Sequence, residues 1–144
     1  MAEAVFSGDT LFIGGVGAFF HGGEIDMHRS INHVLGWLPD SCLVYCGHEY
    51  TVENTRFAKW LEPGNTAVQS RAKWALKRRA YKEPTVPRPI GEERALNPFM
   101  RVRDPIFATL TERRLAVLER ARGWGSLLPG GKKATHKVIK EVDS

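Results

Sequence analysis

The chain has 144 residues, of which 42% are hydrophobic and 26% are charged, the composition of an ordinary globular protein of one or two domains. Its apolar runs are only a few residues long, whereas a membrane-spanning helix needs about twenty, so a membrane is not an expected partner. Lys and Arg number 21 against 16 Asp and Glu, and the formal net charge of +5 favours anionic partners. The two cysteines and the lack of a secretory signal pattern predict a reducing compartment, cytoplasmic or mitochondrial.

The first third of the chain predicts two strands, a loop and a helix. Two β-rich runs, residues 4–7 and 11–13, are split by a Gly-Asp turn signal. Residues 14–23 contain five glycines and predict an irregular loop. Residues 24–35 have the spacing of an amphipathic helix that ends at Gly36. The apolar stripe of this helix consists of Met27, Ile31, Val34 and Leu35.

The middle of the chain continues the alternation of strand and helix. Residues 42–46 form an apolar run that predicts a strand buried on both faces. Residues 51–61 predict a helix that packs through Phe57, Trp60 and Leu61. The repeated order of strand, loop and helix is typical of a layered α/β sheet.

A basic helix is predicted over residues 67–81, with Asn65 as its N-cap. Its inward stripe is expected to comprise Val68, Ala72, Ala75, Leu76 and Arg79. Basic residues crowd the same segment: Arg71, Lys73, Lys77, Arg78, Arg79 and Lys82. Such a cluster could attract nucleic acid, a membrane surface or a small anion, but a solvated helix face is more common and is the expectation here.

The last third of the chain is less regular. Pro84, Pro87 and Pro89 predict an extended connector. Asp104-Pro105 predicts the start of a final helix. Residues 123–144 predict a loose tail with four lysines: Lys132, Lys133, Lys137 and Lys140.

Two potential metal ligands stand where apolar strands end, Asp9 after the first run and His48 after residues 42–46. In open α/β sheets, sites lie beyond the carboxyl ends of strands, so this carboxylate and imidazole could share a divalent metal. A structural role is the more common one, since Asp9 could close a turn and His48 could cap a helix. Cys42 and Cys46 do not predict a zinc site with His48, because four residues of strand separate the sulfurs by about 13 Å.

Six short motifs follow one another along residues 5–103. They are VFSGDTLF at 5–12, the glycine loop with Gly15 and Gly17, VYCGHEYT at 44–51, EPGN at 62–65, PTVP at 84–87, and GEE at 91–93 leading to NPFMR at 97–101. Together they resemble the C-terminal portion of the glyoxalase II (hydroxyacylglutathione hydrolase) family, which belongs to the metallo-β-lactamase superfamily.

The resemblance implies an α/β fold with three parts. Residues 1–62 would form the second half of an αββα sandwich, residues 63–122 a small helical glutathione-substrate domain, and residues 123–144 a flexible basic tail. The implied site holds two metal ions, zinc or a combination of zinc, iron and manganese. The implied reaction hydrolyses the thioester S-lactoylglutathione to D-lactate and glutathione, in methylglyoxal detoxification.

The same resemblance assigns roles to individual residues. Asp9 matches the aspartate that bridges the two metals, and His48 matches a histidine ligand of the second metal. Tyr50 matches a tyrosine that contacts glutathione. Phe20 and Ala18 occupy substrate-binding positions where the family usually has a tyrosine and a basic residue.

Several ligands of the family are missing from this sequence. The His-x-His-x-Asp-His motif and a later histidine are absent, which leaves Asp9 and His48. A catalytic zinc normally takes three protein ligands. We therefore expect this chain alone to bind metal weakly and to hydrolyse the thioester slowly or not at all.

Two other functions remain open. A non-catalytic interaction or regulatory module derived from this family could pair its exposed first strand with another copy or a separate partner. A basic nucleic-acid-binding domain is the less favoured alternative, because the basic helix lacks interleaved exposed aromatic side chains.

Overall fold

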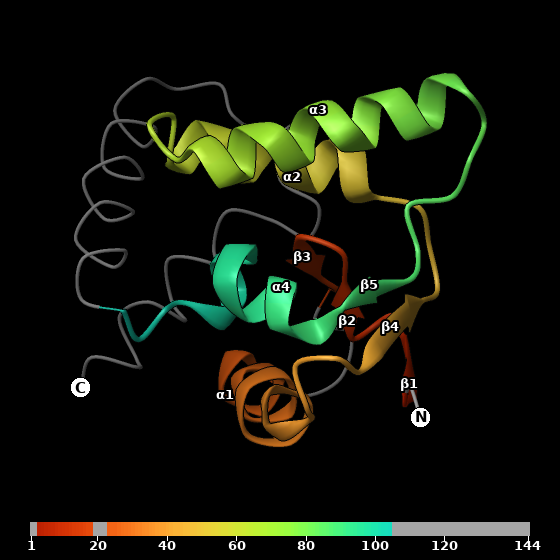
Figure 1. The fold of residues 1–144 in the computed structure, drawn as a ribbon. Helices are drawn as coiled ribbons and strands as arrows, with labels where there is room; N and C mark the ends of the chain where they lie inside the picture. The colour runs from red at the N-terminus through yellow and green to blue at the C-terminus, as the bar shows by residue number, and fades with distance from the viewer. Residues whose placement is uncertain (1–2, 19–22, 105–144) are drawn as a thin grey trace.

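The computed structural model describes residues 3–18 and 23–104, and Figure 1 shows helices arranged around small sheets. The final helix and basic tail expected from the sequence lie outside these residues, as does Phe20. The described part mixes helices and strands, which confirms the α/β class. None of its helices has the length and apolar character needed to cross a membrane.

The larger sheet has three strands in the order β1-β4-β5. β1 (Ala4–Gly8) and β4 (Leu43–Cys46) run parallel, and β5 (Arg88–Pro89) is antiparallel to β4. The proline-rich connector thus returns the chain to the sheet. Because β1 and β4 are parallel, their carboxyl ends lie at the same edge, where Asp9 and His48 follow.

The prediction that the apolar run at residues 42–46 is buried on both faces is wrong. Cys42 and Val44 are fully buried, but Tyr45 is only half-buried. The Tyr45 ring stacks on Phe6, with centroids 5.2 Å apart, and Phe6 is 80% exposed. One face of the run therefore packs into the core. Its opposite face carries the partly exposed stack of Tyr45 on Phe6.

The glycine-rich segment is not irregular throughout, because β3 (Gly15–Val16) forms a hairpin with β2 (Leu11–Phe12). The Asn54 amide donates to the Ile13 carbonyl at 3.2 Å, and the Asn97 amide donates to the Gly15 carbonyl at 3.1 Å. A Cβ on Gly15 would overlap the Asn54 side chain, so this close approach needs glycine. These partners are 41 and 82 residues away, beyond the reach of a local pattern.

The helix predicted over residues 24–35 is present but changes type along its length. α1 (Glu24–His28) passes into the π-helical segment η1 (Arg29–Val34) and then into the 3-10 segment η2 (Leu35–Trp37). Ile31 is buried as predicted, whereas Val34 is 63% exposed. The wider π turn rotates Val34 out of the stripe that an α-helical period predicts, and helical structure continues through Gly36.

Two further helices pack together on the side of the sheet opposite α1 (Figure 1). α2 (Thr51–Leu61) has the predicted bounds and buries Phe57 and Leu61. α3 (Thr66–Ala80) begins within one residue of the prediction. Its predicted cap is confirmed, because the Asn65 side chain accepts hydrogen bonds from the Ala67 and Val68 N–H groups.

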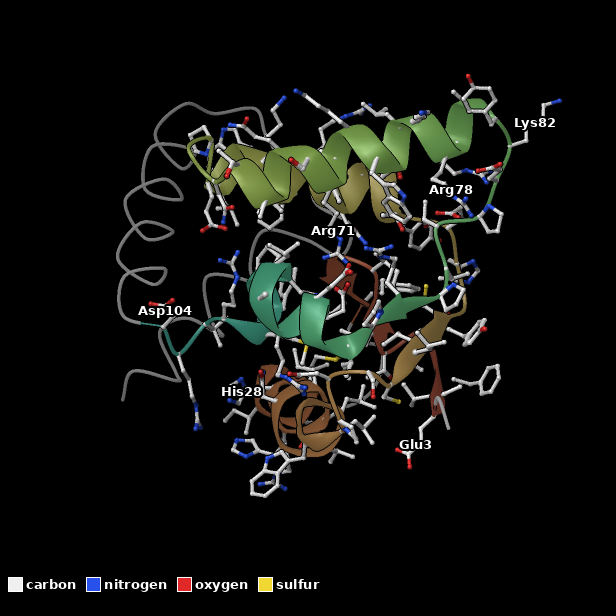
Figure 2. All side chains as sticks on the ribbon, in the orientation of Figure 1. Glu3, His28, Arg71, Arg78, Lys82 and Asp104 are labelled. Atoms are coloured by element: carbon white, nitrogen blue, oxygen red, sulfur yellow. The ribbon has the colours of Figure 1, made fainter. Side chains whose placement is uncertain are left out.

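The buried side of α3 differs from the prediction. Leu76, expected to face inward, is 54% exposed, and Arg79 is exposed too. Arg71, expected in the solvated cluster, is buried and points toward α4 (Ile90–Leu96) in Figure 2. The sequence pattern did not predict α4, although Pro89 followed by two glutamates is a helix-start signal. A short 3-10 segment, η3 (Pro98–Met100), follows α4.

A buried ion pair between Arg71 and Glu93 joins α3 to α4. Glu93 is fully buried, and both of its carboxylate oxygens have partners. One accepts from the Arg71 guanidinium, and the other accepts from the Gly14 N–H at 2.8 Å and the Asn97 amide at 3.1 Å. This carboxylate therefore connects both helices to the β2–β3 hairpin, as a buried charge requires.

The main apolar core lies around the same hairpin. It draws on β2, β3, β4, the π-helical segment and α4. Its buried members are Leu11, Ile13, Val16, Ile31, Cys42, Val44 and Ile90.

Replacing Glu93 with Gln should lower the free energy of unfolding by about 3–5 kcal/mol, because Arg71 would stay buried without a counter-charge. Urea unfolding measures this loss. The double variant R71M/E93Q should recover part of it, since no buried charge remains. An E93Q variant as stable as the parent would show that the ion pair does not hold the two helices.

His28 is a second buried titratable group, at the end of α1. Burial, followed by the charges of Arg103 and His33, lowers its pKa from the usual 6.5. The Asn32 amide nitrogen lies 3.0 Å from His28 Nδ1, and Nε2 has no hydrogen-bond partner among the described residues. The folded protein therefore keeps this imidazole neutral at a pH where the unfolded chain takes up a proton.

We expect the free energy of unfolding to fall as the pH drops below 6.5, because the unfolded chain then binds one more proton at His28 than the folded protein does. A His28→Gln variant should lose this part of the acid sensitivity. Urea unfolding above and below pH 6.5 compares the two proteins. The same pH dependence in both would assign the effect to other groups.

Candidate active site

Asp9 stands on a tight turn between β1 and β2. Gly8 has a left-handed φ of 52°, and the Thr10 N–H donates to the Ser7 carbonyl at 3.0 Å. The Gly17 N–H donates to the Thr10 carbonyl at 3.1 Å, and a Cβ on Gly17 would overlap the Asp9 carbonyl oxygen. The chain after β3 thus packs against the Asp9 main chain, which requires glycine at this contact.

His48 is brought to Asp9 by Gly47 at the end of β4. The Gly47 N–H donates to the Gly8 carbonyl at 2.7 Å, which extends the pairing of β1 and β4. A Cβ on Gly47 would overlap Asp9 Oδ1 and lie 3.2 Å from the Gly8 carbonyl group, so this close approach favours glycine. His48 Nε2 then lies 3.4 Å from Asp9 Oδ2, and both side chains are more than half exposed. The structure therefore joins the two residues that the sequence analysis singled out.

Two aromatic rings complete one side of this site. The Tyr50 ring stacks on His48, with centroids 5.2 Å apart, and meets the buried Phe12 ring edge-on at the same distance. Phe12 belongs to an apolar strand run that predicts a core residue, so sequence reasoning missed its contact with the site. Among the other expected substrate residues, Ala18 is exposed and directly follows Gly17, and Phe20 lies outside the described residues.

The remaining ionisable side chains of this segment have structural partners. Glu49 accepts from the Thr85 N–H at 2.7 Å and from the Thr85 hydroxyl, which fixes the proline-rich connector. The Cys46 thiol donates to the His48 carbonyl at 3.3 Å, and burial raises its pKa. In the part of the chain that the structure describes, no group of three or more His, Cys, Asp or Glu side chains could hold a metal.

The donor atoms of Asp9 and His48 have the separation of two ligands on one ion. Zinc ligands at tetrahedral corners lie about 3.4 Å from one another, given metal–ligand distances of about 2.1 Å. A catalytic zinc takes three protein ligands, however, and the described residues supply two. On their own, these residues do not fit a resident catalytic metal.

A hollow of about 390 Å³ lies elsewhere, between α3 and α4. Trp74 and Arg88 form part of its wall, and the Arg88 guanidinium stacks 4.6 Å from the centre of the Trp74 ring. Glu92 pairs with the same guanidinium. The Asp9–His48 pair does not line this hollow and is instead an exposed surface site.

A Gly47→Ala variant should be less stable than the parent by about 1–3 kcal/mol, because the added methyl group displaces the Asp9 carboxylate and crowds the Gly8 carbonyl group at the end of β1. Gly64→Ala is the matched control, since a Cβ there meets no atom within 4 Å. Urea unfolding should place the control within about 0.5 kcal/mol of the parent. Equal losses in the two variants would contradict the role of Gly47.

Comparison with known proteins gives a consistent result. Residues 49–125 match the family described as hydroxyacylglutathione hydrolase C-terminus. A cytoplasmic hydroxyacylglutathione hydrolase of Arabidopsis thaliana is 48% identical over 102 residues, which cover 71% of this chain and 40% of the relative. A probable hydroxyacylglutathione hydrolase of Schistosoma mansoni is 49% identical over 102 residues, covering 71% and 42%.

A third curated relative, a hydroxyacylglutathione hydrolase-like protein of Gallus gallus, is 45% identical over 113 residues. The matched region covers 78% of this chain and 40% of that relative. The chain thus spans about two-fifths of the length of the curated relatives it matches.

Proposed function

Because this chain belongs to the hydroxyacylglutathione hydrolase (glyoxalase II) family, of which it represents the C-terminal portion, we propose that it serves the hydrolysis of S-lactoylglutathione to D-lactate and glutathione. The observation that carries this proposal is the 3.4 Å approach of His48 Nε2 to Asp9 Oδ2 beside the Tyr50 ring. The relatives named as hydrolases of this thioester class support the choice of substrate.

In this proposal Asp9 and His48 are two ligands of a binuclear metal site. Their donor atoms have a suitable separation for a shared ion, but the count of ligands is too low for a stable catalytic site. Further ligands would have to come from outside the described residues. The chain alone is therefore proposed to bind metal weakly and to have little or no activity.

Tyr50 is proposed to contact the glutathione part of the substrate. Its side chain is 42% exposed, while its ring is held between His48 and Phe12. A ring fixed on two sides loses little freedom when its hydroxyl binds an amide or carboxylate of glutathione. Ala18 and Phe20 are proposed to line the same substrate region, with fewer polar contacts than a basic residue and a tyrosine would give.

The finer fold assignment belongs to the same proposal. Residues 1–62 would be the second half of an αββα sandwich, and residues 63–122 a helical substrate domain. The parallel β1–β4 pair with α1 and α2 on its two sides supports the first part. The pairing of β5 with β4 ties the second part, at residues 88–89, to the sheet.

The exposed edge of β1 favours one alternative, a non-catalytic module that pairs with another chain. β1 is an edge strand among the described residues, and the exposed Phe6 ring lies on it. Another copy of this chain or a separate partner could add a strand there. Light scattering of the purified chain distinguishes the cases, because a clean monomer would argue against pairing between copies.

The proposed function is tested by calorimetric titration of the chain with zinc and with glutathione, together with a thioester hydrolysis assay. We expect weak zinc binding that drops at least tenfold in Asp9→Asn or His48→Gln, because each change removes one of two ligands. Tyr50→Phe should weaken glutathione binding. Turnover of S-lactoylglutathione should be slow or absent.

Glu3→Gln is the matched control for the zinc titration, because Glu3 is an exposed carboxylate directly before β1, at the opposite end of that strand from Asp9. It should leave zinc and glutathione binding unchanged. Failure of the parent chain to bind either zinc or glutathione would contradict the proposed function. A turnover rate like that of a working hydrolase would contradict the proposed need for further ligands.

A further inference from the structure

The outward side of α3 combines cationic and apolar side chains. Four exposed residues follow one another along this side at i, i+3, i+4 and i+7, and a fifth continues the line past the helix end. We call these residues the α3 outer stripe: Lys73, Leu76, Lys77, Ala80 and Tyr81. Leu76 is 54% and Tyr81 70% exposed, so both large side chains face water between the lysines.

The cations around this stripe fall into two groups. Arg78 pairs with Glu83 at 2.8 Å, and the Arg79 guanidinium donates to the Glu83 carbonyl at 2.9 Å, so both arginines fasten the chain after α3. The second group consists of three lysines, Lys73, Lys77 and Lys82. None of them forms an ion pair with a described residue. Figure 2 shows Lys82 extending from the end of α3 into solvent.

We propose that the α3 outer stripe binds the surface of anionic phospholipid membranes. Free lysines complement a negatively charged surface, and their long stems let the ammonium groups reach lipid phosphates while the stems lie along apolar material. Leu76 would enter the headgroup region between Lys73 and Lys77, and the amphipathic ring of Tyr81 suits the same depth. This inference does not depend on the proposed hydrolase function.

The exposed apolar residues favour a membrane over nucleic acid. A phosphate backbone would attract the lysines, but it would leave Leu76 in water. The stripe also runs along the convex outer side of a helix, whereas a peptide partner is usually held in a groove. A flat lipid surface satisfies the lysines, Leu76 and Tyr81 together.

Lys82 allows one charge to be removed without loss of folding. It follows α3 in a left-handed conformation, with φ of 57°, where glycine is favoured. Lys82→Gly should therefore relieve backbone strain while it deletes the charge. Lys73 and Lys77 are exposed on the helix and can be replaced by Gln, a comparable helix former.

The test measures binding of the full chain to vesicles of phosphatidylcholine, with and without phosphatidylserine, by cosedimentation at low and physiological ionic strength. The parent should bind the anionic vesicles and not the neutral ones. Each lysine replacement should weaken binding about fivefold, and K73Q/K77Q/K82G about a hundredfold. Leu76→Ser should weaken it about fivefold at both salt concentrations, because its contribution is apolar.

Arg29→Gln is the matched control, because Arg29 is an exposed cation on η1, on the side of the molecule away from α3 (Figure 1). It should leave vesicle binding nearly unchanged. Circular dichroism checks that every variant is folded. Because the tail lysines remain in every variant, full binding by the triple variant would assign the membrane contact to the tail and overturn the proposal.

Two further results would also overturn it. Equal binding to neutral and anionic vesicles would exclude recognition of lipid charge. If Leu76→Ser has no effect on vesicle binding while the triple variant loses binding to a single-stranded oligonucleotide, the stripe is a nucleic-acid surface and not a membrane surface.

Discussion

The buried ion pair of Arg71 and Glu93 is the interaction on which the arrangement of this protein depends. A buried carboxylate is tolerated only if its charge is balanced and its oxygens accept hydrogen bonds. Glu93 meets both conditions by drawing in three separate parts of the chain: the Arg71 guanidinium from α3, the Gly14 N–H from the β2–β3 hairpin, and the Asn97 amide from the end of α4. No two of these parts could move apart without leaving a buried polar group unpaired.

The candidate site takes its geometry from this network through the hairpin. Asn97 also holds the Phe12 and Gly15 carbonyls, and the chain that leaves the hairpin packs Gly17 against the Asp9 main chain. Phe12, at the same hairpin, meets the ring of Tyr50, which stacks on His48. The exposed Asp9–His48 pair is therefore supported from below by buried contacts, although neither residue is itself buried.

α3 connects this interior to an exposed surface. One side of the helix buries Arg71 with its counter-charge, and the other side exposes Leu76 between lysines. A count of basic residues treats Arg71 and Lys77 alike, yet only the second is available to a partner. A cation on α3 is free only if it lies on the side of the helix that does not meet a carboxylate. Here the carboxylate is that of Glu93 on α4.

The sequence by itself determined the features that depend on neighbours within a few residues. The bounds of α2 and the Asn65 cap of α3 follow from local spacing and from a side chain that bonds the N–H groups two and three residues later. The six motifs and their order also identified the family, and the position of Asp9 and His48 after two strands of a predicted α/β sheet made a shared site one possibility. Only the tertiary structure decided the strand β3, the outward turn of Val34 and the burial of Arg71, because each depends on packing or on partners distant in sequence. The partner of Gly14 is 79 residues away, and a periodic pattern carries no information over that separation.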